Sequence, residues 1–277
     1  MNFTSNISWA NTLGSVLQGN PVTIKCADGQ ERDTIEIVGD TIVCDMNCPV
    51  VTWTKRKVSF KYMTAEAAWI LSGSNLVADI VPYNERLLKY SDDGLTFFGA
   101  YGPKVIGQIN YIIETLAQDP SSRRAVLNIW RENPPVGKDT PCTLSAQFLI
   151  RNNTLDTVVT MRSSDVWLGL PYDIFTFSMI AGFVFLKLRS AGLKLSGLGS
   201  ITNFAGSRHL YQQDVDKIKE LKFIEEPGST EELTRSALFH VQNFDSGEAL
   251  IEHLWAVARG SRAELKDKFL SDLPHIK

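Results

Sequence analysis

The sequence predicts an α/β (α+β) protein in which a mixed β-sheet is flanked by helices. Two runs rich in β-branched and apolar residues, AQFLIR and LDTVVTMR, flank Asn152 and Asn153, a combination typical of a β-hairpin. Two longer runs, over 105–118 and 172–190, place apolar residues at helical spacing. The 277 residues contain no internal repeat and no low-complexity linker, so one domain over 1–277 is expected.

The first part of the chain is predicted to contain β-structure followed by a short buried helix. In residues 33–43, DTIEIVGDTIV, apolar and polar residues alternate on both sides of a Gly-Asp step. This pattern predicts a hairpin within an N-terminal β arm over about 20–50. Thr64 is predicted to cap the helix AEAAWIL, which ends at Gly73. Glu66 would then lie in the first turn of that helix.

The middle of the chain alternates between helix and strand. The helix over 105–118 ends before an Asp-Pro step, and the run AVLNIW over 125–130 predicts a strand. Arg123 and Arg124 fall in the connection between them.

The longest apolar stretch, Ile174 to Leu186, lies inside the predicted helix over 172–190. It is too short to cross a bilayer and is followed by basic residues, so we expect a buried core helix and no membrane insertion. The remaining residues, over about 216–277, are predicted to form a peripheral helical tail.

Composition and charge exclude some classes of function. A formal net charge of -3 provides no bulk attraction to a polyanion, so direct nucleic-acid binding is not expected. The N-terminus MNFTSNISWANTLG lacks the basic start and apolar run of a signal peptide, which indicates a cytoplasmic protein.

The four cysteines indicate a reducing compartment rather than a disulfide framework or a metal site. They are Cys26, Cys44, Cys48 and Cys142, irregularly spaced in a chain too long to need disulfides. Cys44 and Cys48 lie four residues apart, but no second pair of ligands follows at a zinc-like spacing. No metal is therefore expected.

One cysteine has neighbours that suggest chemistry. A cysteine in a segment such as DTPCTLSAQF is more often a buried structural residue than a nucleophile. Downstream of Cys142, however, the segment MRSSDVWLGLPYDI places Arg162, Ser163, Asp165 and Asp173 around a Leu-Gly-Leu-Pro turn. Polar residues of this density, where a strand gives way to a buried helix, indicate a site.

These segments resemble the thymidylate synthase and deoxycytidylate hydroxymethylase family. RSSDVWLGLPYDI is similar to the nucleotide-binding signature of that family, and DTPCTLSAQF is similar to its nucleophile segment. Further similar segments occur in the same order between about 50 and 215, namely TWTKRKVSFKYMTAEAAWILSG, GAYG, DPSSRR and GSRHLY. The resemblance implies the fold of that family, a homodimer formed through the sheet, and 5,10-methylenetetrahydrofolate as one-carbon donor.

The resemblance also implies a covalent mechanism. Cys142 resembles the thiolate that attacks C6 of the pyrimidine and turns C5 into a nucleophile. Arg162 would lower the pKa of that thiol and contact the nucleotide phosphate, with Ser163 beside it. Glu66 resembles the carboxylate that organises water and moves protons at the base, and Tyr101 resembles the tyrosine implicated in removing the C5 proton.

The remaining site residues are also carried over from the resemblance. His209 and Tyr211 resemble the pair that bonds the sugar hydroxyl, and Asp165 resembles the aspartate that helps to hold base and pterin. Trp69 resembles the aromatic wall near the folate ring, and Leu168 and Gly169 are assigned to the same folate side. A helical Trp is otherwise more often plain core.

Arg123 and Arg124 resemble a pair that reaches the phosphate in the neighbouring subunit's active site. Without the resemblance, adjacent arginines in a turn are usually solvent-facing. The N-terminal arginine of the family's phosphate loop has no clear counterpart, and only Lys25 or Arg32 could replace it.

Two departures from thymidylate synthases indicate a cytosine substrate. The position of Asp173 is an asparagine in those enzymes, whose amide fits the N3-H and O4 of uracil. Cytosine instead offers N3 as an acceptor and its 4-amino group as a donor, which a carboxyl group fits better than an amide. The same aspartate occurs in deoxycytidylate hydroxymethylases. Thr143 replaces the histidine that usually follows the nucleophile. Two members of the uracil-specific hydrogen-bond network are therefore absent.

A third departure bears on the product. SDLPHIK replaces the small apolar tail that excludes water in thymidylate synthases, which favours hydration to a hydroxymethyl group over reduction to methyl. The expected activity is therefore hydroxymethylation of dCMP. CMP hydroxymethylation, dCMP methylation, dUMP methylation and an idle nucleotide-binding subunit remain alternatives, and a deoxy substrate would suggest a bacteriophage source.

Overall fold

A computed structural model of the chain describes residues 4–25, 29–53, 56–134, 137–220 and 238–260. Within these ranges six strands form one mixed sheet in the order β1-β2-β6-β5-β4-β3. Their bounds are β1 Asn20–Lys25, β2 Glu31–Asp45, β3 Val126–Asn128, β4 Thr143–Arg151, β5 Thr154–Asp165 and β6 Gly197–Tyr211. Only the pairing of β5 with β6 is parallel among these described strands, and the predicted α+β class is confirmed.

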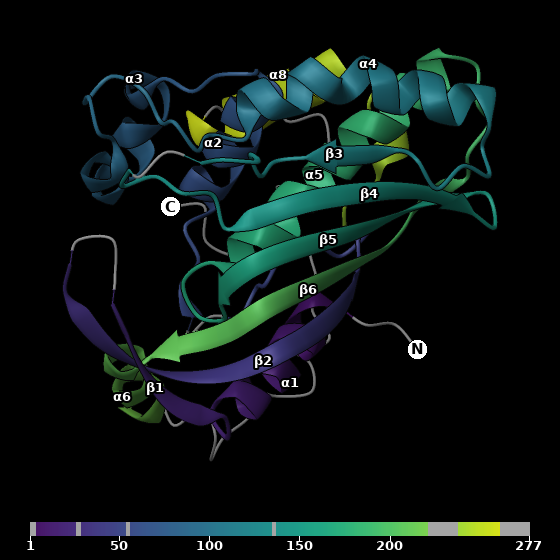
Figure 1. Cartoon of the computed structure of the whole chain (residues 1–277). Coiled ribbons are helices and arrows are strands. Elements are labelled where there is room, and N and C mark those ends of the chain that lie inside the picture. Colours follow the sequence, from purple (N-terminus) through teal and green to yellow (C-terminus); the bar gives the residue numbers. More distant parts are fainter. Residues whose placement is uncertain (1–3, 26–28, 54–55, 135–136, 221–237, 261–277) are drawn as a thin grey trace.

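The helices lie on one side of the sheet. The α-helices are α1 Ser5–Val16, α2 Phe60–Leu71, α3 Val77–Ile80, α4 Gly102–Gln118, α5 Leu170–Ser190, α6 Gln212–Glu220 and α8 Gly247–Ala258. Short 3-10 helices are η2 Val81–Tyr83, η3 Glu85–Tyr90 and η4 Val241–Asn243. Figure 1 shows α1 and α5 behind the sheet and no helix in front of it, so one sheet face is covered and the other is open.

Alternating burial along β5 matches this arrangement. Leu155, Val159 and Met161 are buried against the helices, whereas Val158 and Thr160 on the opposite face are half-buried. Helix α5 is the one helix in the described ranges with the length and hydropathy of a membrane span, and 83% of that stretch is buried within the protein. The predicted core helix is therefore confirmed, with its start at Leu170.

The hairpin around Asn152 and Asn153 is confirmed. Both residues have positive φ, 48° and 65°, as the two central residues of a type I′ turn require, and β4 pairs with β5 on either side. The hairpin predicted over 33–43 is wrong. Gly39 has φ +75° but lies inside the continuous strand β2, because β6 pairs along the whole of that strand. The antiparallel neighbour of β2 on its other side is β1.

The predicted start of α2 is also wrong. Ser59 caps the helix by accepting from the backbone N–H of Tyr62, and the Thr64 hydroxyl bonds the carbonyl of Phe60 inside the helix. Glu66 therefore lies in the second turn. The predicted end is right, because Gly73 follows the last turn with φ +74°.

Other boundaries differ by a few residues. Helix α4 ends at Gln118 as predicted but begins at Gly102, and the strand predicted over 125–130 is ordered as β3 only over Val126–Asn128. Helix α1 was not predicted. Of the predicted tail, α6 and α8 are helical, whereas 221–237 and 261–277, including SDLPHIK, lie outside the described residues.

Candidate active site

Cys142 lies at the start of β4, where Arg162 of β5 holds the preceding loop. The Arg162 guanidinium donates to the carbonyls of Pro141 at 3.0 Å and Thr140 at 3.1 Å. Its Nη2 lies 3.8 Å from Cys142 Sγ, and the Arg162 backbone N–H donates to the Cys142 carbonyl at 2.8 Å. The loop and the thiol are thus fixed to one cationic side chain.

Burial and nearby carboxylates act on the pKa of the Cys142 thiol in the direction opposite to the Arg162 cation. Burial raises the pKa of the half-buried Cys142 thiol, Arg162 lowers it, and Asp173, Asp139 and Asp165 raise it further. The direction expected for Arg162 is confirmed, but burial outweighs it and the net shift is upward. The thiol of the free protein is therefore mostly protonated at neutral pH.

Tyr101 and Thr143 are joined directly. The Tyr101 hydroxyl oxygen accepts from Thr143 Oγ1 at 3.0 Å and from the Thr143 backbone N–H at 3.3 Å. Burial first, and then the charge of Cys142, raise the pKa of Tyr101, so its hydroxyl stays neutral. Its own O–H remains able to donate to a ligand.

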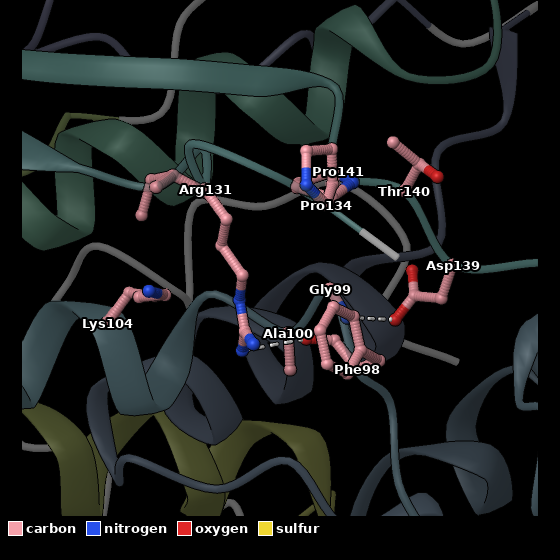
Figure 2. A pocket seen from close by; sticks show the side chains of 10 residues that line it. Phe98, Gly99, Ala100, Lys104, Arg131, Pro134, Asp139, Thr140 and Pro141 are labelled. Carbon is pink, nitrogen blue, oxygen red and sulfur yellow. Dashed lines mark hydrogen bonds between the residues drawn. The ribbon is translucent and has the colours of Figure 1, made fainter. Parts of the chain in front are cut away.

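A second contact joins the segments that carry Tyr101 and Cys142. In the small pocket of Figure 2 the Asp139 carboxylate accepts from the backbone N–H of Gly99 at 2.7 Å. Arg131 lies over the Phe98 ring, with 3.9 Å from its guanidinium carbon to the ring centroid. The GAYG segment and the loop before Cys142 are therefore held together by a half-buried carboxylate, whose pKa is raised by its burial.

The carboxyl group of Glu66 on α2 is bonded to α5, the helix that carries Asp173. Tyr62 O–H makes a very short hydrogen bond to Glu66 Oε1, and Thr176 Oγ1 donates to Glu66 Oε2 at 3.4 Å. Burial raises the pKa of Glu66. Burial, and then the charge of Glu66, raise the pKa of Asp173 to about 7.

The predicted nucleotide-side residues lie on β5 and β6. Asp165 pairs with His209 in the parallel register, and the backbone N–H of Val166 donates to the His209 carbonyl. The rings of His209 and Tyr211 lie edge to face with centroids 5.3 Å apart. Burial lowers the pKa of His209 and raises that of Asp165, while each charge partly offsets the shift of the other. Ser163 lies nearby on β5, half-buried.

The predicted folate side contains two buried polar atoms without a hydrogen-bond partner. Asp165 Oδ1 accepts from the backbone N–H groups of Trp167 and Leu168, both at 2.8 Å, but Asp165 Oδ2 has no donor among the described residues. Trp69 Nε1 is likewise buried and unpaired in the described part of the chain, with its ring edge-on to Phe97. One orphaned donor and one orphaned acceptor are thus found among the residues assigned to the folate.

Residues 11–244 match the family model described as thymidylate synthase. The chain belongs to the thymidylate synthase family.

Three curated phage proteins are similar to this family member. A "Deoxyuridylate hydroxymethyltransferase" of Pseudomonas phage M6 is 32% identical over 182 residues, 62% of this chain and 50% of the relative. A protein of the same name from Bacillus phage SP01 is 29% identical over 181 residues, 57% and 45% of the two chains. A "Thymidylate synthase" of Enterobacteria phage T4 is 28% identical over 214 residues, 68% and 71%. The chain thus spans about half the length of the two hydroxymethyltransferases.

The turn before α5 is shaped by glycine. Gly169 is the N-cap, and its carbonyl accepts from the backbone N–H of Asp173 at 3.0 Å. A side chain added at Gly169 would come within 3.4 Å of the Asp165 carbonyl and 3.6 Å of Asp173 Oδ2. The adjacent Leu168 is exposed. Both distances are ordinary van der Waals contacts, so Gly169 is a close neighbour of the two aspartates at the start of α5.

Two predicted residues of this family member lie away from the site in its own chain. Arg123 and Arg124 are exposed in the connection between α4 and β3. The carbonyl of Arg123 accepts from Gln147, and Arg124 contacts Ser122. No described contact joins them to Cys142. Lys25 and Arg32 lie at the end of the β1–β2 hairpin.

Four buried side chains next to the site were not predicted. Tyr62 and Thr176 bond Glu66, and Arg56 donates to the Trp167 carbonyl while lying 4.9 Å from the Trp167 ring centroid. Arg208, fully buried on β6, is the fourth. The sequence contains no local signal for these roles: Arg56 stands in a basic run typical of a solvated surface, and Tyr62 has helical spacing typical of core.

The cysteine pair of the N-terminal half lies in the core. Cys44 and Cys48 are both buried, and burial raises the pKa of the Cys44 thiol to about 12. In the part of the chain that the structure describes, no group of three His, Cys, Asp or Glu residues is arranged to hold a metal ion.

Proposed function

We propose that this chain is a deoxycytidylate 5-hydroxymethyltransferase. It would convert dCMP, 5,10-methylenetetrahydrofolate and water into 5-hydroxymethyl-dCMP and tetrahydrofolate. The observation that carries this proposal is the carboxyl group of Asp173 on α5, whose pKa is raised to about 7 by burial and then by the charge of Glu66. Such a group can still hold a proton when it meets the base.

The proton of Asp173 matches the edge of cytosine. Cytosine offers N3 as an acceptor and its 4-amino group as a donor. A protonated carboxyl can donate to N3 and accept from the amino group, and the same two bonds form if the proton moves to N3. A site that hydrogen-bonds one edge can reject the mismatched base by roughly 10⁴-fold.

The covalent step would use the thiol of Cys142. Its thiolate forms a bond to C6 of the pyrimidine, and C5 becomes the carbon nucleophile. Binding of substrate must therefore remove the thiol proton against the effect of burial, with Arg162 stabilising the anion. Glu66 would order water and transfer protons at the base, and Tyr101 would assist removal of the C5 proton.

The folate would supply the one-carbon unit at the C5 side. Asp165 Oδ2 and Trp69 Nε1, the two orphaned buried atoms, would bond or contact its ring, with Leu168 and Gly169 beside them. His209 and Tyr211 would bond the sugar hydroxyl, and Arg162 with Ser163 would bind the phosphate.

A homodimer would complete the phosphate site. The open sheet face in Figure 1 includes Phe204, 38% exposed, and Val43, 37% exposed, with Val158 and Thr160 on neighbouring positions. An open apolar sheet face of this kind favours self-association. Arg123 and Arg124 of each subunit would then reach the partner's nucleotide.

Hybrid dimers test the shared site. Dimers of Cys142→Ser and of a variant with Arg123→Ala and Arg124→Ala should each be nearly inactive. After random reassortment, half of the dimers are mixed and contain one intact site, so about a quarter of wild-type activity should return. Failure to recover activity would show that the two arginines serve their own subunit or none.

A second candidate is hydroxymethylation of dUMP. It is favoured by the names of the phage M6 and SP01 relatives, both deoxyuridylate hydroxymethyltransferases. Phage relatives also favour action in the cytoplasm of an infected bacterium. The carboxyl group at Asp173 favours cytosine over this alternative.

The decisive experiment offers [5-³H]dCMP, CMP and dUMP in turn, with methylenetetrahydrofolate, and measures tritium release together with the ultraviolet absorbance of dihydrofolate. Release from dCMP without dihydrofolate, abolished by Cys142→Ser, supports the proposal. Dihydrofolate would indicate a methylase, release from dUMP alone the second candidate, and preferred use of CMP a ribonucleotide enzyme. No release from any substrate would indicate an idle nucleotide-binding subunit.

A further inference from the structure

The connection between α4 and β3 carries two exposed arginines on a fixed backbone. Arg123 and Arg124 are exposed, whereas the flanking Ser122 and Ala125 are buried, at 5% and 0% exposed. The Ser122 backbone N–H donates to the Asp119 carbonyl at 3.0 Å, and Ser122 Oγ accepts from the backbone N–H of Arg124 at 3.3 Å. The turn is therefore closed by its own bonds, while the two arginine side chains face solvent.

The carbonyls of the two arginines are each bonded by a side chain from another element. Gln147 Nε2 on β4 donates to the Arg123 carbonyl at 2.7 Å, and the Tyr111 hydroxyl on α4 donates to the Arg124 carbonyl at 3.1 Å. These bonds restrain the peptide units that orient the two guanidinium groups. Such restraint lowers the entropy cost of presenting both groups to a ligand.

Gln147 connects this restraint to the open face of the sheet. Its neighbours Ala146 and Phe148 are both 0% exposed in the core, so Gln147 projects to the opposite face of β4. There it is paired with Val158 of β5, which belongs to the open face through which the homodimer is proposed to form. One side chain thus lies on the proposed dimer face and holds the Arg123 carbonyl.

Tyr111 holds the second carbonyl from the solvent side of α4. Its side chain is 52% exposed, whereas Ile109 and Ile112 on the same helix are buried, at 8% and 1% exposed. Core packing of α4 therefore uses those neighbours. Removing the Tyr111 hydroxyl should alter the arginine connection without opening the core.

We propose that Tyr111 and Gln147 are positioning residues that hold the backbone of Arg123 and Arg124 so that both guanidinium groups reach the nucleotide phosphate of the partner subunit. This inference rests on the proposed shared phosphate site. It assigns part of nucleotide binding in one subunit to two residues of the other that do not touch the nucleotide. Arginine binds phosphate through a rigid planar fork, so a small rotation of its backbone weakens the bonds to phosphate.

The test uses heterodimers in which one chain carries Cys142→Ser and has no working site. Two different affinity tags allow these heterodimers to be purified. The intact site then receives its two arginines from the Cys142→Ser chain. Tyr111→Phe in that chain should raise KM for dCMP, or for dUMP if wild type uses that nucleotide, about 3- to 10-fold, the effect of one hydrogen bond. The kcat for tritium release should change little, and Gln147→Met should act in the same direction.

The matched control moves the same variant to the other chain. Tyr111→Phe in the chain with the intact Cys142 alters only the arginines that serve the inactive site, so KM should stay at the value of the heterodimer without it. Tyr90→Phe in the Cys142→Ser chain is a second control. Tyr90, on η3, is also exposed, at 44%, and no described bond joins it to the arginines, so KM should again stay unchanged.

The outcomes are distinguishable. An equal rise in KM for both placements of Tyr111→Phe would overturn the inference, because the hydroxyl would then act within its own subunit. Unchanged KM in both placements would overturn it too, and the shared phosphate site would stand if Arg123→Ala with Arg124→Ala in the Cys142→Ser chain still disables the intact site. If that arginine variant has no effect there, the shared site of the proposed function fails and this inference fails with it.

Discussion

The hydroxyl oxygen of Tyr101 accepts a hydrogen bond from Thr143 Oγ1 at 3.0 Å. The residue that replaces the usual histidine after the nucleophile therefore contacts the tyrosine assigned to C5 proton removal. Since Thr143 also donates its backbone N–H to that oxygen, the tyrosine O–H is directed away from Thr143. Thr143 and Tyr101 therefore form one hydrogen-bonded unit next to Cys142.

Removing the Thr143 hydroxyl should slow C5 proton removal. Thr143→Val keeps the shape of the buried side chain but removes the donor, so the orientation of Tyr101 is lost. We expect kcat for tritium release to fall about 10-fold, the equivalent of one hydrogen bond, with little change in KM for the nucleotide. Thr143→Ser should retain most of the rate. A change in KM alone would show that Thr143 serves binding rather than Tyr101.

Arg162 should control the reactivity of the Cys142 thiol. Because its cation lowers a pKa that burial raises, Arg162→Met should raise that pKa further and reduce the thiolate fraction at pH 8. The rate of iodoacetamide alkylation at Cys142, followed by mass spectrometry, should fall about 3- to 10-fold.

Arg162→Lys separates charge from loop geometry. It keeps a cation but loses the paired bonds to the Thr140 and Pro141 carbonyls. A rate close to wild type in this variant would assign the effect to charge. Equal loss in both variants would contradict the electrostatic explanation and point to movement of the loop.

Local signals predicted some of the fold because their physics is local. Asn152 and Asn153 tolerate positive φ, so the turn is specified by two adjacent residues. Gly39 also has positive φ, yet β2 continues through it because β6 supplies hydrogen bonds along both halves. A local sequence pattern cannot predict pairing with a strand more than 150 positions away in the sequence. It also does not predict that Ser59, and not Thr64, caps α2.

The candidate site residues were named from the resemblance and not from any local pattern in the sequence. That resemblance indicated Cys142, Glu66 and Asp173, and the structure brings their segments together. It contained no information on Tyr62 or Arg208, whose roles depend on which buried atoms lie opposite them after folding. Such contacts are created by tertiary packing, and a buried tyrosine or arginine has no distinguishing spacing in the chain.

Asp173 should make stability depend on pH. Its pKa is raised from 3.8 to about 7, so the folded state binds a proton that the unfolded state releases. That contribution is fully present below the unfolded pKa and is lost as pH rises to about 7. Asp173→Asn removes this loss, so its advantage in unfolding free energy over wild type should grow between pH 4 and pH 7 by about 3 kcal/mol.

Urea denaturation across that pH range measures the effect. Asp119→Asn provides a contrast, since bonds from Ser121 lower the pKa of Asp119, so wild type should gain relative to that variant as pH rises through the unfolded value. A pH-independent difference for Asp173→Asn would mean that folding does not raise the pKa of Asp173, which would also weaken the cytosine proposal.

Arg208 and Asp40 should contribute strongly to stability as a pair. Arg208, fully buried, donates from Nε to Asp40 Oδ2 at 3.0 Å on β2, and its other nitrogens bond Ser164 on β5 and Asn203. One side chain therefore ties three neighbouring strands beneath the site. Arg208→Met leaves the carboxylate without its cation, so we expect unfolding to become easier by about 3 to 5 kcal/mol.

A double-mutant cycle isolates the pair itself. Asp40→Leu alone leaves a buried guanidinium without a counter-charge, whereas the double variant with Arg208→Met leaves neither charge. The double variant should therefore be more stable than the sum of the two single losses predicts, by at least about 1 kcal/mol in urea denaturation. Additive losses would mean that the bonds to Ser164 and Asn203, rather than the ion pair, carry the contribution of Arg208.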